Sequence, residues 1–296
     1  MKRKKKLLKF MLPLAAAMLL FPSVASSQTL RGDFNMDGQV NISDVIAMAN
    51  YLSTGTLGEV SPADRDTLTV NGVPFVMVRV KGGSYTLKYG KVRTIPDFWI
   101  GETEVTCDLW WAVMGRDNHP FGGLGCAMRG LTWFDCQAFV DSMNRLTGKN
   151  FRLPYADEWR FAASGGTLTR GYRYSGSDNL DEVGWYSSNT VDLGYSTRYI
   201  SVASKAPNEL GLYDMSGDVA EVVQEMNEST GNAGEMYRIY WAFGGHADSN
   251  ADECRPTSWL LRSENSNQSA IYGCGMRLAI PTSDEPWEFI EWPSAY

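Results

Sequence analysis

The chain has 296 residues, of which 44% are hydrophobic, and a formal net charge of −7 at neutral pH. Ten tryptophans, 14 tyrosines and 12 phenylalanines supply enough apolar surface for a well-buried core, which excludes a disordered chain. The acidic balance, with no compact basic patch beyond the first nine residues, argues against nucleic acid as a partner.

The N-terminus has the three parts of a secretory signal peptide. Six lysines and arginines lie in the first nine positions, an apolar stretch runs from Phe10 to Phe21, and small residues follow from Ser23 to Ser27. The apolar stretch is shorter than the roughly 20 residues that a membrane-spanning helix needs. We therefore expect removal of residues 1–26 and a secreted, periplasmic or cell-surface protein with no membrane span.

Residues 32–52 have the spacing of a calcium-binding loop followed by a helix. Oxygen-bearing side chains alternate along the loop, and Gly38 occupies its sharp turn. Calcium binds several oxygen ligands at about 2.3–2.6 Å, and alternate positions of a tight loop direct them toward one centre. The expected ligands are Asp33, Asn35, Asp37, Gln39, Asn41 and Asp44. The alternative is an Asx-rich turn that caps the following helix.

This segment resembles one half of a dockerin, with its NISDV start and closing YL. Dockerins normally carry two such repeats, whereas Ser61–Thr67 has only two aspartates and no glycine turn. The resemblance implies a short EF-hand-like loop and helix within residues 27–67. The segment either braces the main domain or docks a partner in a calcium-dependent manner.

From Leu68 onward, alternating apolar residues predict β-strands over Val73–Arg79 and around Phe98–Gly101. Three helices are expected to follow, the first two because apolar residues recur at helical spacing. The third is expected because Pro154 suits the first turn of a helix and Gly165-Gly166 would end it. The helices are one capped by Thr106 that carries Leu109, Trp110, Val113 and Met114, one over Trp133–Leu146, and one over Tyr155–Ala163. Beyond Gly166 the periodicity fades, which predicts long irregular connections.

Five sequence blocks, in order, resemble the formylglycine-generating enzyme family, also called sulfatase-modifying factors. The blocks are VNGVPFVMVRVKGGSY, IGETEVTCDLWWAVMG, LTWFDCQAFVDSMNRLTGKNFRLPYADEW, PNELGLYDMSGDVAEV and GMRLA. They cover Thr69–Ile280, nearly all of a main domain expected over residues 68–296. The resemblance implies an α+β, C-type-lectin-like fold with little regular secondary structure.

Within the RLPYADEW segment, the residue types indicate a structural role. Arg152 and Glu158 are expected to pair, while the apolar Leu153 and Trp159 fill the core.

Members of this family that make formylglycine bind copper through two cysteines, because soft thiolates select Cu(I). The matching run here keeps the second cysteine as Cys254, but Ser249 replaces the first and His246 replaces a serine. A serine hydroxyl is a poor Cu(I) ligand, so we expect no oxidase activity. The alternative is a copper-dependent formylglycine-generating oxidase that acts on sulfatase cysteines, with Cys254 as the catalytic residue and His246 as a second copper ligand.

In the same family, the block around GLYDMSGDVAEV supplies oxygen ligands to a structural calcium and an aromatic wall to the substrate cleft. Asp218 and Glu221 retain carboxylates and are the expected calcium ligands, together with main-chain carbonyls. Ala220 and Val222 replace two tryptophans, which removes aromatic area that could stack on a ligand.

Five cysteines in an exported chain allow at most two disulfides and leave one thiol. Cys136 lies on the inner stripe of a helix, and Cys107 and Cys126 have a loop-bridging separation. A bridge between Cys254 and Cys274 would remove the Cys254 thiolate from any chemistry. The sequence leaves the pairing open.

The preferred hypothesis is a non-catalytic binding or accessory protein whose lectin-like scaffold displays residues 243–272 to a protein, peptide or glycan ligand. Related scaffolds serve as variable display proteins in some bacteria and phages. Aromatic, cationic and small polar side chains suit adaptable contacts. The expected ligand-binding residues are His246, Ser249, Arg255, Trp259 and Arg262, with Trp241 beside them.

Overall fold

The computed structural model describes residues 64–86, 92–115, 123–191, 200–230, 236–263 and 272–282. All of them belong to one of the two compact units of the chain, Ala63–Tyr296. The predicted signal peptide and the predicted calcium loop from Asp33 to Asp44 lie outside the described residues. Within the described ranges, no helix is both long and apolar enough to cross a membrane.

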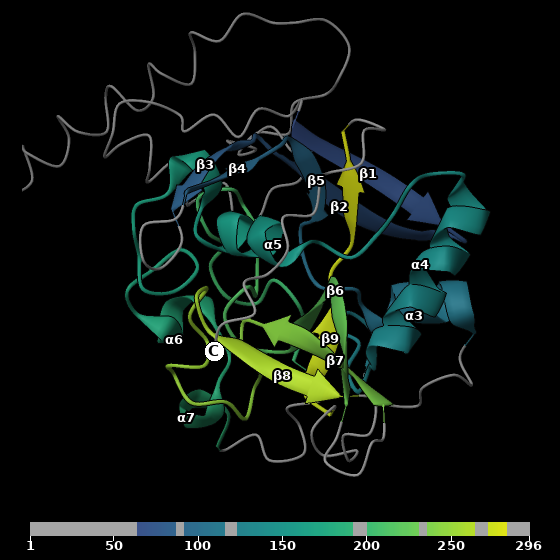
Figure 1. Ribbon diagram of the computed structural model, residues 1–296. Coiled ribbons are helices and arrows are strands. Elements are labelled where there is room, and N and C mark those ends of the chain that lie inside the picture. The colour runs from purple at the N-terminus through teal and green to yellow at the C-terminus, as the bar shows by residue number, and fades with distance from the viewer. Residues whose placement is uncertain are drawn as a thin grey trace, which may run out of the picture. The chain divides into compact units, whose positions relative to one another are not determined.

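Two four-stranded sheets and one hairpin form the framework of this unit (Figure 1). The first sheet has the antiparallel order β1-β2-β5-β10, made of Arg65–Val70, Val73–Val80, Phe98–Gly101 and Ala279–Pro281. The hairpin pairs β3 (Gly83–Thr86) with β4 (Val92–Ile95). The predicted strands over 73–79 and 98–101 are confirmed as β2 and β5.

The second sheet has the order β8-β7-β6-β9, made of Trp259–Ser263, Met236–Phe243, Ala220–Thr230 and Cys274–Met276. Strands β6 and β9 run parallel, whereas the other neighbours are antiparallel. The chain therefore passes from the second sheet at Met276 to the first sheet at Ala279. Arg277 lies at this crossing between the two sheets.

The three predicted helices are confirmed as α3 (Cys107–Met114), α4 (Trp133–Thr147) and α5 (Ala156–Ala163). Thr106 caps α3 through its side chain, and Thr132 and Asp135 form a reciprocal capping box on α4. Tyr155 is the N-cap of α5 rather than its first residue. Two single-turn helices, α6 (Leu180–Val183) and α7 (Ser187–Thr190), and a 3-10 turn at Gly166–Leu168 follow.

The core consists of two large apolar clusters and a small third one. In the first cluster α3 and α4 pack together, and Trp110 stacks on Phe139 with 5.0 Å between ring centroids. In the second, Trp159 of α5 stacks on Phe243 of β7. The expected Arg152–Glu158 pair is confirmed, with two hydrogen bonds of 2.6 and 2.7 Å, and Leu153 and Trp159 are buried.

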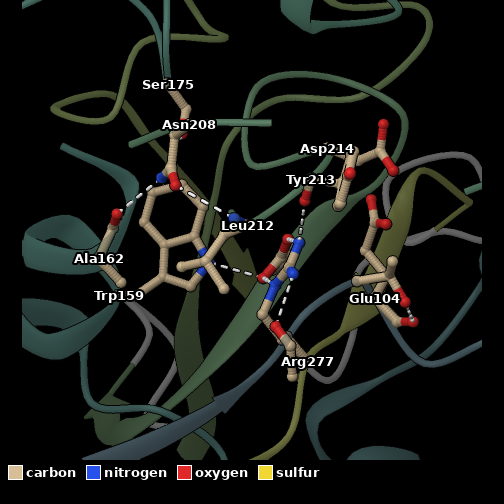
Figure 2. Close-up of polar contacts among 12 residues, drawn as sticks. Glu104, Trp159, Ala162, Ser175, Asn208, Leu212, Tyr213, Asp214 and Arg277 are labelled. Carbon is tan, nitrogen blue, oxygen red and sulfur yellow. Dashed lines mark hydrogen bonds and ion pairs between the residues drawn. The ribbon is translucent and has the colours of Figure 1, made fainter. Parts of the chain in front are cut away.

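Irregular connections between α5 and β6 are held by specific side chains. Asn208 donates to the carbonyl of Ala162 at 2.8 Å and to the hydroxyl of Ser175 at 3.0 Å, while its own oxygen accepts from the Leu210 and Leu212 amides (Figure 2). One buried side-chain amide thereby hydrogen-bonds four groups, three of which lie in the connections outside α5. This texture confirms the expected α+β class with little regular structure.

Candidate functional site

The two sheets meet at a fully buried ion pair between Arg277 and Glu221 (Figure 2). Arg277 donates to Glu221 through Nη2 at 2.7 Å and Nε at 2.9 Å. Its remaining donors reach the carbonyls of Gly101 at 2.9 Å and Tyr213 at 2.7 Å. Trp159 adds a third donor to Glu221, with Nε1 2.6 Å from Oε2. Both oxygens of Glu221 are therefore occupied by protein donors.

Three further carboxylates lie buried beside this pair. Glu104 is 2% exposed, and neither of its carboxylate oxygens has a hydrogen-bond partner. Asp214 accepts from the Ala203 amide at 2.6 Å through Oδ2, and Asp218 accepts from Arg129 at 2.8 Å through Oδ1, but the second oxygen of each is unpartnered. The side chains of Glu104 and Asp214 point toward one another in Figure 2.

Burial and mutual repulsion raise the pKa of each of these carboxyls. Desolvation, followed by the charge of Asp218, raises the pKa of Asp214 to about 7. Desolvation raises the pKa of Asp218 to about 6 even though the Arg129 charge opposes it. The pKa of Glu104 is raised well above its ordinary value by burial and then by Asp214. Unpaired buried carboxylates need a proton or a cation to offset their desolvation.

The backbone around this group is strained. Asp214 and Asp218 adopt φ values of 58° and 55°, in the left-handed region that non-glycine residues enter uncommonly. Such strain persists where surrounding structure holds it, often at functional positions. The segment between them includes Gly217, whose added Cβ would lie 2.1 Å from the Trp185 carbonyl oxygen.

The expected calcium ligands Asp218 and Glu221 differ in what they can offer a cation. Asp218 has one free oxygen, but both oxygens of Glu221 are engaged, so a cation would have to break its bonds to Arg277 and Trp159. In the described part of the chain, no three His, Cys, Asp or Glu side chains form a group that could hold a metal ion. A cation here would need main-chain oxygens or water as further ligands.

Sequence reasoning missed Glu104 and Asp214. An aspartate four residues before Asp218 within GLYDMSGD was a usable signal, since both lie in one family block. Nothing local marked Glu104, which lies more than 100 residues earlier and reaches the group only through the folding of the chain.

Cys254 lies in a turn and is fully buried in the third apolar cluster, with Tyr174, Leu180 and Val183. Its Sγ is 3.5 Å from the Asn250 carbonyl oxygen, and burial raises the pKa of this thiol to about 12. All five cysteines are buried and none is in a disulfide, so neither the Cys254–Cys274 nor the Cys107–Cys126 pairing is formed.

Ser249 is the residue expected from the sequence to stand in place of the first copper cysteine. The residue is 2% exposed, and its Oγ has no hydrogen-bond partner. Ser249 is therefore inaccessible to a surface ligand, as is Trp241, which is 5% exposed.

His246 is half-buried, and its Nδ1 accepts a hydrogen bond from the Asp248 amide at 3.2 Å. Burial is the largest cause of its lowered pKa, with Arg262 and Arg129 adding to the effect against Asp248 and Glu253. The neutral ring therefore carries its proton on Nε2. To bind these two side chains, copper would have to displace the thiol proton of Cys254 and either the proton on Nε2 or the Asp248 amide on Nδ1.

The remaining predicted ligand residues are partly exposed. Trp259 and Arg262 lie on β8 and are half-buried. Arg255 pairs with Asp252, which Arg173 also contacts. Of these three residues, Arg262 is the one whose charge lowers the pKa of His246.

Comparison with known proteins agrees with this architecture. The Sulfatase-modifying factor enzyme 1-like domain matches residues 64–282, and the chain belongs to this family. A relative named Chaperone protein LppX, from Paenibacillus barcinonensis, is 30% identical over 240 residues, which is 66% of this chain and 83% of the relative.

Solved structures show the same fold. Treponema denticola variable protein 1 has a TM-score of 0.58 and 25% identity, over 74% of this chain and 99% of that one. CarF has a TM-score of 0.57 and 23% identity, over 71% and 99% of the two chains. PvdO from Pseudomonas aeruginosa has a TM-score of 0.53 and 18% identity, over 72% and 97%. The expected fold family is confirmed.

Proposed function

We propose that this protein is an exported, non-catalytic binding or accessory member of the sulfatase-modifying factor family. The observation that carries the proposal is the state of Cys254, which is fully buried and has a pKa raised to about 12. Cu(I) binds thiolate rather than thiol. With serine at the other position, the chain lacks the pair of thiolates that the oxidase chemistry needs.

An anaerobic copper titration followed by a turnover assay tests this proposal. Reduced protein is loaded with Cu(I) and then given oxygen and a cysteine-containing sulfatase peptide. We expect no stoichiometric copper and no conversion of the cysteine. Turnover that disappears in Cys254→Ser would overturn the proposal in favour of the oxidase.

Ser249→Cys provides the matched gain-of-function control. The substitution changes one buried oxygen to sulfur at a site whose hydroxyl makes no hydrogen bond, so it should be tolerated. If the missing thiolate is what prevents copper binding, this variant should bind more Cu(I) than the natural chain does.

The relatives support a binding role. One is named a chaperone and another a variable protein. The ligand of this chain is proposed to be a secreted or periplasmic protein, peptide or glycan, held near His246, Arg255, Trp259 and Arg262. Screening a displayed peptide library and a glycan array for binding to the protein tests this role. A selected ligand should bind His246→Ala more weakly than the natural chain. It should bind Arg145→Gln, an exposed change on α4, as tightly as the natural chain.

Calcium is proposed as a structural ion near the unpartnered oxygens of Glu104, Asp214 and Asp218, with main-chain oxygens or water as its further ligands. Binding would relieve their mutual repulsion. Calcium should therefore raise the melting temperature of the natural chain, and EDTA should reverse the effect. Asp214→Asn should lose this response if the ion lies among the buried carboxylates, whereas Asp37→Asn should lose it if the ion lies in the predicted loop. No response in the natural chain would contradict both sites.

A further inference from the structure

Arg262 is a half-buried arginine that forms no ion pair with a carboxylate in the part of the chain that the structure describes. Among the described arginines that are buried or half-buried, every other one forms an ion pair with an aspartate or glutamate. Arg262 instead donates through Nη1 to the Leu261 carbonyl at 3.2 Å and contacts the Cys274 sulfur, while its Nε is buried without a partner. Among the described residues, therefore, no carboxylate is paired with its positive charge.

His246 is held in place as a hydrogen-bond donor. Its Nδ1 is occupied by the Asp248 amide, so the proton on Nε2 is available to an acceptor. The ring lies against the backbone of Gly273, where an added Cβ would come within 2.5 Å of the ring. Cys274, the next residue, contacts Arg262. Two neighbouring residues, Gly273 and Cys274, thus contact His246 and Arg262, respectively.

The charges around the ring come from four side chains, namely Asp248, Glu253, Arg262 and Arg129. Arg129 is already paired with Asp218. The Asp248 carboxylate lies on the Nδ1 side at 3.9 Å and is largely exposed, and Glu253 accepts from the Asn250 amide at 3.1 Å. The Arg262 guanidinium is the cation left for an incoming group.

We propose that His246 and Arg262 together recognise a carboxylate on the ligand, supplied by an acidic side chain of a bound peptide. A guanidinium presents parallel N–H donors that match a carboxylate, and charge-assisted hydrogen bonds of this kind are stronger than neutral ones. A neutral imidazole N–H adds a donor without adding charge. This inference rests on the proposed binding function and defines the chemistry of its ligand.

Acetate titration monitored by NMR of the histidine rings tests the site directly. The chain has two histidines, His119 and His246, and His246→Gln assigns the signals. At constant ionic strength, acetate should shift the His246 signal and raise its pKa, because a bound anion stabilises the imidazolium. Arg262→Gln should raise the acetate-free pKa of His246, since a nearby positive charge is removed, and should abolish the response to acetate.

Three probes distinguish the source of the carboxylate. An acetylated and amidated Asp-Glu-Asp peptide should bind at least 10-fold more weakly to Arg262→Gln than to the natural chain, and its Asn-Gln-Asn counterpart should not bind. Arg145→Gln is the control for loss of one positive charge. Tighter binding of glucuronate than of the peptide would assign the carboxylate to a glycan and overturn the peptide source.

An unchanged acetate response in Arg262→Gln, or no response in the natural chain, would overturn the inference. Neither result bears on the copper assay, which depends on Cys254. Oxidase turnover would refute the proposed function, but it would not change what the acetate titration shows about His246 and Arg262.

Discussion

Arg277 and Glu221 form a two-point ion pair in which neither side chain is exposed. Arg277 comes from the crossing between β9 and β10, and Glu221 from the start of β6, so the pair joins the two sheets. Trp159 of α5 donates to the same carboxylate. One charged pair therefore fixes three elements that are distant in sequence.

Removing one partner of this pair should be strongly destabilising. Arg277→Met leaves Glu221 buried and uncompensated, and we expect a loss of about 3–5 kcal/mol in the free energy of unfolding. Urea denaturation followed by tryptophan fluorescence measures the loss. The double variant with Glu221→Gln should lose less than the sum of the single changes. Strict additivity would show that the pair does not act as a unit.

Glu225 should make stability depend on pH. Its two oxygens accept from the Ala156 amide at the start of α5, and burial raises its pKa to about 7 from an ordinary value near 4.5. Between these two pH values the folded state holds more protons than the unfolded state. The contribution of Glu225 to the free energy of unfolding therefore falls as the pH rises from about 4.5 to about 7.

The free energy of unfolding should therefore fall less between pH 5 and pH 8 in Glu225→Gln than in the natural chain. The difference should be at most about 3 kcal/mol. Urea titrations at several pH values measure the slope. Glu228→Gln, an exposed change on the same strand, should leave the slope unchanged. Equal slopes in the natural chain and Glu225→Gln would contradict the assignment.

The cysteines should be unreactive until the protein unfolds. All five are buried, and burial raises the pKa of each, to about 12 for Cys107 and Cys254. A disulfide reagent at pH 8 should label almost no thiol in the folded protein and all five in urea. Recovery of only three thiols after unfolding would show that a disulfide had formed. Rapid labelling of Cys254 in the folded state would instead reveal an accessible thiolate.

Gly184 should tolerate no side chain. A Cβ at this position would lie 1.9 Å from the Ser216 carbonyl oxygen, which belongs to the backbone and cannot move aside as a side chain could. We expect Gly184→Ala to cost about 3 kcal/mol or more. Gly171→Ala has a strained φ of 72° but no atom within 4 Å of its Cβ, and should cost only about 1 kcal/mol. Thermal unfolding of the two variants measures which one loses more stability. A smaller loss in Gly184→Ala than in Gly171→Ala would show that the loop around Ser216 adapts.

Local patterns predicted the regular elements well. Thr106 before an apolar helical repeat was sufficient to locate α3, because a cap and its helix are adjacent in sequence. The Arg152–Glu158 pair was equally predictable, since the two residues are six positions apart and straddle the start of α5. Five ordered family blocks were sufficient to identify the fold.

What the sequence determined by itself was the fold family and the three main helices, and it raised the expectation that Ser249 stands in place of a copper cysteine. The tertiary structure decided that Ser249 and Trp241 are buried, that Glu221 is committed to Arg277, and that Glu104 joins Asp214. It also placed Arg262 near enough to His246 for its charge to act on the ring, with no carboxylate paired to Arg262 among the described residues. These outcomes depend on burial and on contacts between distant segments, and neither is encoded in the spacing of neighbouring residues.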